Sequence, residues 1–115
     1  MYKKKFTEYN DIINFTVYKN IASSAFHLIV VNINFKKLKK NKNDLLNFFI
    51  KNKIISQFHY IPIYKFKVAN NFYKNKFPGA DMYFKNSLSL PVFTDLSMKK
   101  LNYTILKIKQ FIDRN

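Results

Sequence analysis

The C-terminal part of the chain shows the clearest periodic pattern of apolar positions. Large apolar side chains recur there at spacings of three and four residues, which is typical of one face of a helix. These positions are Met98, Leu101, Ile105, Ile108 and Ile112. Ser97 precedes them and predicts an N-cap, because a serine hydroxyl can accept a hydrogen bond from a backbone N–H of the first turn. The pattern therefore predicts an amphipathic helix that Ser97 opens.

Weaker helical patterns occur in four other stretches. Tyr2–Ile13 places aromatic and aliphatic residues three and four apart, which predicts a short amphipathic helix. Asn43 is predicted to be the N-cap of a helix that runs through Ile50, and Asp44 is favourably placed in the first turn of this helix. Phe66–Tyr73 is predicted to be a short surface helix. Pro78 suits the first turn of a further helix that continues to Lys85.

Three other stretches show strand patterns. Phe26–Phe35 is apolar on both alternating faces, which predicts a central strand covered on both sides. Ile54–Tyr60 is predicted to be a second strand. Ser87–Phe93 alternates strictly, which predicts a strand with one buried face, and Pro91 suits a sheet edge or a strand end.

The remaining stretches connect these elements into one small domain. Phe15–Ser24 is polar and aperiodic, and Lys36–Lys42 is predicted to be a solvated basic loop. The resulting order is helix, strand, helix, strand, helices, strand, helix. It predicts an α/β fold in which a small sheet of about three strands is packed by helices. A chain of 115 residues is expected to form one domain, residues 1–115, that buries about two-thirds of its unfolded surface.

The net charge of +15 raises the question of a nucleic-acid partner. Among 21 basic residues only Arg114 is an arginine, whereas protein sites that read bases or clamp phosphates usually use arginine forks. Lysine, asparagine, isoleucine, phenylalanine and tyrosine all have A- and T-rich codons, so a low-GC genome explains the bias. We therefore expect no specific nucleic-acid partner. A stand-alone basic module that binds polyanions is kept as an alternative.

Composition also excludes several kinds of site. The chain has no cysteine, which excludes disulfides and thiolate metal sites, and its single glycine excludes a glycine-rich phosphate loop. The two histidines lie far apart and the six carboxylates are scattered, so no metal site is expected. The lysines after Met1 are not followed by an apolar signal-peptide core, and the best apolar run, Phe26–Ile33, is too short to span a bilayer. We expect a cytoplasmic protein without a membrane segment.

The stretch Ser56–Tyr64 holds the best candidates for a functional site. It reads Ser-Gln-Phe-His-Tyr-Ile-Pro-Ile-Tyr, and it places His59 beside Tyr60 where the predicted strand gives way to a loop. Strand ends on a packed scaffold often present functional side chains. The alternative is that His59 only ties the strand end to a backbone carbonyl. His27, at the start of a strand, is expected to be a buried, hydrogen-bonded histidine.

Six short segments, taken in their order along the chain, carry a resemblance to a known family. They are Ser24-Ala25-Phe26-His27-Leu28-Ile29-Val30-Val31, Asp44-Leu45-Leu46, His59-Tyr60-Ile61-Pro62, Phe77-Pro78-Gly79-Ala80, Ser87-Leu88-Ser89-Leu90-Pro91-Val92-Phe93 and Leu96-Ser97. In order and spacing, the chain resembles over nearly its whole length the C-terminal small domain of the DegT/DnrJ/StrS family of sugar-nucleotide aminotransferases. The His-Tyr-Ile-Pro version most resembles the branch that serves pseudaminic acid synthesis. That branch aminates a UDP-linked 4-keto-6-deoxy-N-acetylhexosamine.

The resemblance implies the fold of the C-terminal domain of fold-type I pyridoxal-phosphate aminotransferases. It implies pyridoxal phosphate as the cofactor of the full-length family, with the cofactor and the catalytic lysine in a large N-terminal domain. No catalytic or cofactor-binding residue is therefore expected in this chain. The amino donor of the family is usually glutamate. The implied partners are a nucleotide-sugar substrate and a large aminotransferase domain or a homodimer partner, and the implied substrate-binding residues are His59, Tyr60 and, more weakly, Tyr64.

The chain departs from the family pattern in two respects. It has Lys53-Ile54-Ile55-Ser56 where the family often has a glycine before its strand. Family chains are also a few times longer, so this sequence resembles a detached or truncated C-terminal third and is not expected to be active alone. The other alternative is an inactive remnant of a broken gene.

Overall fold

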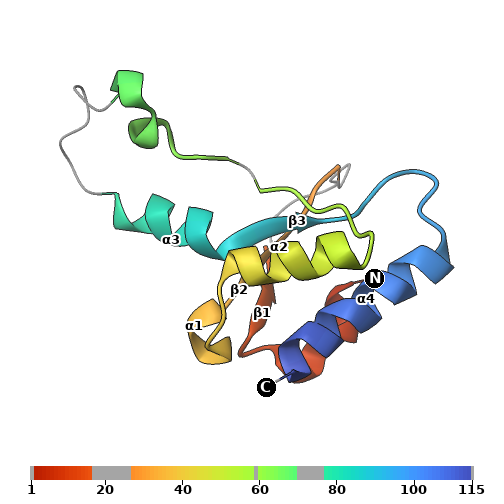
Figure 1. The fold of residues 1–115 in the computed structure, drawn as a ribbon. Helices are drawn as coiled ribbons and strands as arrows, with labels where there is room; N and C mark the ends of the chain where they lie inside the picture. Colours follow the sequence, from red (N-terminus) through yellow and green to blue (C-terminus); the bar gives the residue numbers. More distant parts are fainter. Residues whose placement is uncertain (1, 17–26, 59, 70–76, 115) are drawn as a thin grey trace, which may run out of the picture.

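The computed structural model describes residues 2–16, 27–58, 60–69 and 77–114 (Figure 1). In chain order the elements are the 3-10 turns η1 (Lys3–Lys5) and η2 (Thr7–Tyr9), the strands β1 (Ile13–Phe15) and β2 (Ile29–Ile33), the helices α1 (Phe35–Leu38) and α2 (Lys42–Lys51), the 3-10 turns η3 (Ile63–Lys65) and η4 (Lys67–Ala69), the helix α3 (Pro78–Asn86), the strand β3 (Ser87–Leu90) and the helix α4 (Met98–Asp113). The predicted α/β fold with a three-stranded sheet packed by helices is confirmed.

The sheet is antiparallel and has the order β1-β2-β3, so β2 is the central strand, as predicted. Val31 pairs with Phe15 on one side and with Leu88 on the other, which places these three apolar side chains in one row on one face. The next row, on the opposite face, contains Asn32 and Ser87, and the Asn32 amide donates a hydrogen bond of 3.3 Å to the Ser87 hydroxyl. The two faces therefore differ in polarity.

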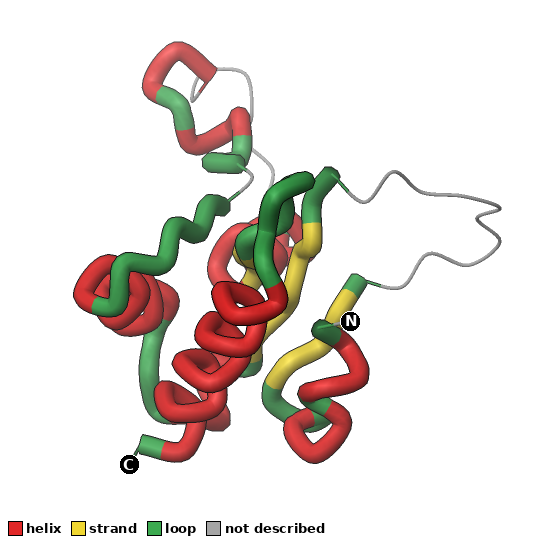
Figure 2. The backbone as a smooth tube through the Cα atoms, turned by 90° about the vertical axis from the view of Figure 1, so that its right-hand side faces the viewer, coloured by secondary structure: helices red, strands yellow, loops and turns green. Residues whose placement is uncertain are grey.

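The apolar face of the sheet forms the core together with α2 and α4. Val31 of β2 and Leu45 of α2 have no exposed surface, and Ile108 of α4 keeps only 1% of its surface exposed. These residues belong to one contiguous apolar cluster, in which the N-terminal turns also take part through Tyr2 and Phe6. In Figure 2 the helix that leads to the C-terminus, α4, lies along the strands. On the other face, Val30 of β2 is half-buried, so the predicted covering of this strand on both sides is partial.

Local capping explains where the two long helices begin. Ser97 accepts a hydrogen bond from the backbone N–H of Lys100, which confirms the predicted cap of α4. The cap of α2 is Asn41 rather than the predicted Asn43. Asn41 Oδ1 accepts from the N–H of Asp44 at 3.0 Å, and the Asp44 carboxylate accepts from the N–H of Asn41 at 2.7 Å. This reciprocal capping box outcompetes a cap two residues later because it satisfies two backbone donors.

Two predicted elements differ in the structure. The N-terminal stretch forms two 3-10 turns instead of an α-helix, and Ile13 begins strand β1. Ile54–Tyr60 does not form a strand in its described part. It makes one bridge, between Gln57 and Ser89, in which the N–H of Ser89 donates to the carbonyl of Gln57 at 2.6 Å. Phe15–Ser24 and Phe66–Tyr73 were predicted as a connection and a helix, and both lie partly outside the described residues.

The predicted basic loop 36–42 is also more ordered than expected. It contains most of α1 and the first residue of α2. The ammonium of Lys40 donates to the carbonyl of Phe111 at 2.6 Å, and Lys37 forms an ion pair with Asp11. By contrast, α3 begins at Pro78 as predicted. None of the described helices is long and apolar enough to cross a membrane.

Lys53, two residues after the end of α2, has an unusual backbone conformation, which provides a first test of the fold. Its φ is +55°, in the left-handed region that favours glycine. The N–H of Lys53 donates to the carbonyl of Ile50 and that of Ile54 to Phe49, which is the hydrogen-bond pattern of a Schellman motif. We expect Lys53→Gly to raise the free energy of unfolding by roughly 0.5–1 kcal/mol, because it removes left-handed strain. Chemical denaturation measures this difference.

The matched control for this test is Lys51→Gly, two residues earlier and within the helix. A glycine there should lower the stability by about 1 kcal/mol. Destabilisation by both substitutions would contradict the assigned helix end.

A second test concerns Tyr2, whose side chain is 2% exposed and whose hydroxyl donates to the carbonyl of Pro91 at 3.0 Å. Burial raises the pKa of Tyr2 to about 12. The folded chain therefore keeps a proton that the unfolded chain loses above pH 10, so this contribution to stability declines as the pH rises from 10 towards 12. At pH 7, Tyr2→Phe should cost about 1 kcal/mol through the lost hydrogen bond. In urea titrations, the difference in the free energy of unfolding between the unaltered chain and Tyr2→Phe should become smaller above pH 10. A difference that does not change with pH would contradict the assignment.

Candidate functional site

An arm leaves the body of the fold after α2. We define the arm as the described residues between 57 and 69, which end in η3 and η4, and Figure 1 shows it in green running past α3. The chain has a radius of gyration of 15.6 Å, whereas a compact domain of this length is expected to have about 13 Å. The arm extends beyond the body of the fold and contributes to this larger radius (Figure 1).

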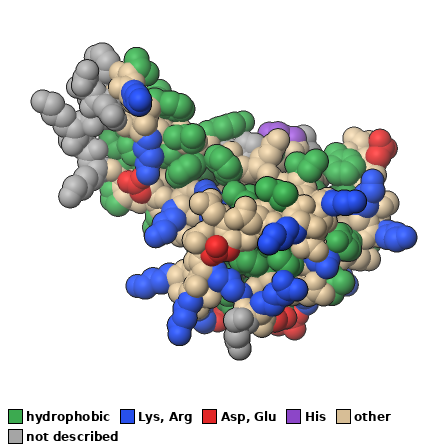
Figure 3. All heavy atoms as spheres, in the orientation of Figure 1, with side chains coloured by type: hydrophobic (Ala, Val, Ile, Leu, Met, Phe, Trp, Pro, Cys, Tyr) green, Lys and Arg blue, Asp and Glu red, His purple; other side chains and the backbone are tan. Residues whose placement is uncertain are grey.

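Apolar side chains on the arm are largely exposed. Those with at least 40% of their surface exposed are Phe58, Tyr60, Ile61, Ile63, Phe66 and Val68. Figure 3 shows hydrophobic side chains gathered along this part of the surface. Single exposed apolar residues are common, but a contiguous group usually marks a site of interaction.

Of the three sequence-predicted site residues, the structure describes Tyr60 and Tyr64, and these two have different surroundings. Tyr60 lies on the arm with 76% of its surface exposed. Tyr64 is half-buried, and its ring stacks on Phe77 with 4.8 Å between centroids. Burial of the hydroxyl raises the pKa of Tyr64, and the nearby Asp81 carboxylate raises it further. His59 lies outside the described residues, so its predicted role stays a prediction.

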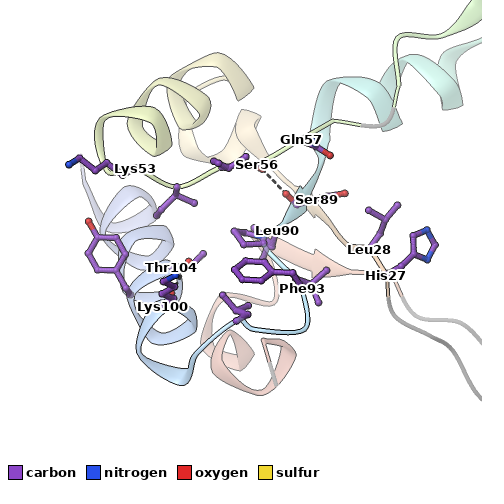
Figure 4. Close-up of a pocket in the computed structure, with 16 residues that line it drawn as sticks. His27, Leu28, Lys53, Ser56, Gln57, Ser89, Leu90, Phe93, Lys100 and Thr104 are labelled. Carbon is purple, nitrogen blue, oxygen red and sulfur yellow. Dashed lines mark hydrogen bonds between the residues drawn. The ribbon is translucent and has the colours of Figure 1, made fainter.

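A groove of about 570 Å³ lies on the other side of the bridge between Gln57 and Ser89. We define the groove by its lining residues: His27, Leu28, Lys53, Ile54, Ile55, Ser56, Gln57, Ser89, Leu90, Pro91, Val92, Phe93, Leu96, Lys100, Tyr103 and Thr104. Ser56 holds one wall to β3, because its hydroxyl donates to the Ser89 carbonyl at 2.6 Å (Figure 4). The groove is therefore built between the segment after α2, the end of β3 and the first half of α4.

The groove has an apolar floor and a basic rim. Figure 4 shows Lys53 and Lys100 on one side, His27 on the other, and Leu90 and Phe93 between them. Its lining residues include no carboxylate. Two ammonium groups without a carboxylate among the lining residues favour an acidic occupant.

The groove contains residues that sequence reasoning missed, and neither Tyr60 nor Tyr64 lines it. His27 was predicted to be buried, but the side chain is exposed and lies at the rim, because β2 begins only at Ile29. Lys53 carried a partial signal, because it begins the stretch Lys53-Ile54-Ile55-Ser56, in which the resembling family often has a glycine before its strand. Nothing in the sequence pattern distinguishes Lys100 from the other lysines of α4.

Comparisons with known proteins agree with this architecture. A sequence model of the DegT/DnrJ/EryC1/StrS aminotransferase family matches residues 1–109. Helicobacter pylori PseC, an aminotransferase involved in the biosynthesis of pseudoaminic acid, has a similar fold, with a TM-score of 0.83 and 19% identity; the match covers 97% of this chain and 30% of PseC. Spr1654 from Streptococcus pneumoniae in its PMP form gives a TM-score of 0.81 at 23% identity, with 97% and 28% covered.

One curated protein adds a match in sequence. MJ1066 of Methanocaldococcus jannaschii is 23% identical over 118 residues, which is 100% of this chain and 30% of that protein. The chain thus spans about a third of the length of the relatives that it matches.

The residues described here do not fit pyridoxal phosphate. That cofactor needs a lysine, an acidic or basic partner for its pyridine nitrogen and phosphate donors in one cavity. The groove offers two lysines, but its lining contains neither a carboxylate nor an arginine to pair with the pyridine nitrogen. A second cavity of about 400 Å³ contains Asp81, but its carboxylate already pairs with the Lys65 ammonium at 2.6 Å. No group of three potential metal ligands occurs among the described residues either.

This misfit predicts how the isolated chain responds to the cofactor. After incubation with pyridoxal phosphate and borohydride reduction, peptide mapping should show label spread over several lysines, with none reaching one label per chain. Stoichiometric labelling of a single lysine, accompanied by transaminase activity, would contradict the prediction.

Proposed function

This chain belongs to the DegT/DnrJ/EryC1/StrS aminotransferase family, and we propose that it acts as the C-terminal small domain of a pyridoxal-phosphate-dependent sugar aminotransferase that a large domain completes. The observation that carries the proposal is the family match over residues 1–109 of a chain that spans only about a third of its relatives. The chain is not active alone, because the cofactor site belongs to the large domain.

The proposed reaction transfers an amino group to a UDP-linked 4-keto-6-deoxy amino sugar, with glutamate as the donor, in nucleotide-sugar or surface-glycan synthesis. The resemblance of His59-Tyr60-Ile61-Pro62 to the pseudaminic acid branch supports this substrate, as does the similarity of the fold to PseC. When bound, the cofactor supplies the electron sink, and the protein supplies binding, orientation and electrostatics.

The arm contributes to substrate binding in this proposal. The phenol of Tyr60 is well exposed and is suited to a sugar hydroxyl or a diphosphate oxygen. We propose that His59 donates to the same ligand and that Tyr64 supports it from the stacked position on Phe77. Charged ligands strengthen such hydrogen bonds, which makes their loss measurable.

The large domain is the proposed partner for the exposed apolar surface of the arm and for the groove. Ile55 is 81% exposed and Phe93 is 52% exposed, and both line the groove, so burying them would release water from apolar surface. The basic rim of Lys53 and Lys100 favours an acidic segment of that partner. A partner that binds only the folded chain also stabilises it by mass action.

The test is co-expression of this chain with the large domain of a family member. We expect a complex in which the small domain melts at a higher temperature than alone, and which aminates the keto sugar. His59→Ala and Tyr60→Ala should each lower kcat/KM for the nucleotide sugar by about tenfold to a hundredfold, while cofactor binding is nearly unchanged.

Tyr9→Phe serves as the control, because its hydroxyl bonds to Asp113 away from the arm. An equal kcat/KM for the nucleotide sugar in all variants would mean that His59 and Tyr60 have a structural role and do not bind the substrate. Absence of any complex, together with tight salt-dependent binding of a polyanion, would instead favour a stand-alone basic module.

A further inference from the structure

The ring of Phe84, in the last turn of α3, is a meeting point of three distant segments. The Lys42 ammonium lies 4.2 Å from its centroid and the Lys65 ammonium 5.6 Å from it. The Phe58 ring packs edge-on against it, with 5.9 Å between centroids. These groups come from the start of α2, from η3 and from the beginning of the arm. One aromatic ring thus joins the body, α3 and the arm.

Lys42 makes several contacts at this point. Its backbone begins α2 inside the capping box of Asn41 and Asp44. Its ammonium lies 5.0 Å from the Phe58 centroid and donates to the carbonyl of Phe84. That carbonyl is in the final turn of α3, where helix carbonyls lack partners within the helix. Burial lowers the pKa of Lys42, so its ammonium is sparingly hydrated, which strengthens its attraction to the two rings.

A second anchor lies seven residues further along the arm. Lys65 pairs with Asp81 at 2.6 Å, and Tyr64 stacks on Phe77, immediately before α3. Between Phe58 and Tyr64, the exposed residues Tyr60 and Ile61 are thus bracketed by contacts to one short helix and its N-cap. Helix α3 therefore supports this part of the arm through contacts at both of its ends.

We propose that Lys42 and Phe84 are positioning residues that fix the Tyr60–Tyr64 stretch of the arm relative to the body. The consequence for sugar binding rests on the proposed function, whereas the positioning itself does not. A narrower alternative is that Lys42 only caps the C-terminus of α3. The two alternatives differ in what happens to the arm when the charge is removed.

The absence of native cysteines allows a direct distance measurement on the 115-residue chain. Val68→Cys on η4 and Leu106→Cys on α4 are exposed positions for nitroxide labels, at 80% and 51% exposure. Double electron–electron resonance then reports the distribution of distances between the arm and the body. We expect one narrow distribution, which Lys42→Met and Phe84→Leu each broaden at least twofold.

Two variants serve as controls. Lys42→Arg should keep the narrow distribution, because a guanidinium also stacks on rings and donates hydrogen bonds. Tyr83→Leu changes the neighbouring exposed aromatic residue of α3 and should have no effect. A distribution that is already broad in the unaltered pair, or one that stays narrow in both Lys42→Met and Phe84→Leu, would overturn the proposal. Circular dichroism of each variant verifies that α2 and α4 remain folded.

A kinetic measurement separates this inference from the proposed function. In the complex with a large domain, Lys42→Met should raise KM for the nucleotide sugar several-fold and change kcat less than twofold, because the ligand-binding stretch is displaced and the reacting groups are not. If no active complex forms, the proposed function fails and the distance distributions still decide the positioning. An unchanged KM in an active complex with a broadened distribution would overturn the role of the positioning in binding.

Discussion

The apolar face of the three-stranded sheet is the constraint on which the rest of the structure depends. A sheet this small can shield that face only with helices, and α2 and α4 both pack against it. Val31 at the centre of the sheet has no exposed surface, so the pairing of β2 on both sides fixes the whole core. The helix caps at Asn41 and Ser97 then set where the covering helices begin.

The two long helices, α2 and α4, both cover the apolar face of the sheet. Other surfaces of the chain therefore stay available to partners. The arm contributes little to the core and keeps its apolar side chains exposed, while the groove opens beside the end of β3. Polar and aromatic contacts to α3 hold the arm in place instead of burial in the core. The arm is therefore fixed by a few contacts at its ends and leaves most of its apolar surface available to a partner.

The parts of this fold that depend on local signals could be predicted from the sequence. The cap of α4, the proline that begins α3 and the central position of β2 follow from spacing and single residues. The predicted stripe of α4 is buried from Leu101 to Ile112, whereas Met98 is 54% exposed because it lies in the first turn. The N-terminal turns could not be predicted, because Phe6 and Ile13 have helical spacing but are buried by turns and a strand that only the sheet stabilises. The arm and the groove depend on contacts between distant residues, such as Lys42 with Phe84, that no local pattern encodes.

The central claim is that the arm and the groove are the surfaces through which this chain joins a large aminotransferase domain. Hydrogen exchange of the chain, alone and mixed with a separately produced large domain of the family, tests it most directly. The account predicts slower exchange at residues 60–69 of the arm and at 53–57 and 91–96 of the groove, with the interior of α4 unchanged. Identical exchange in both samples, or protection confined to the N-terminal turns and the C-terminal half of α4, would contradict it.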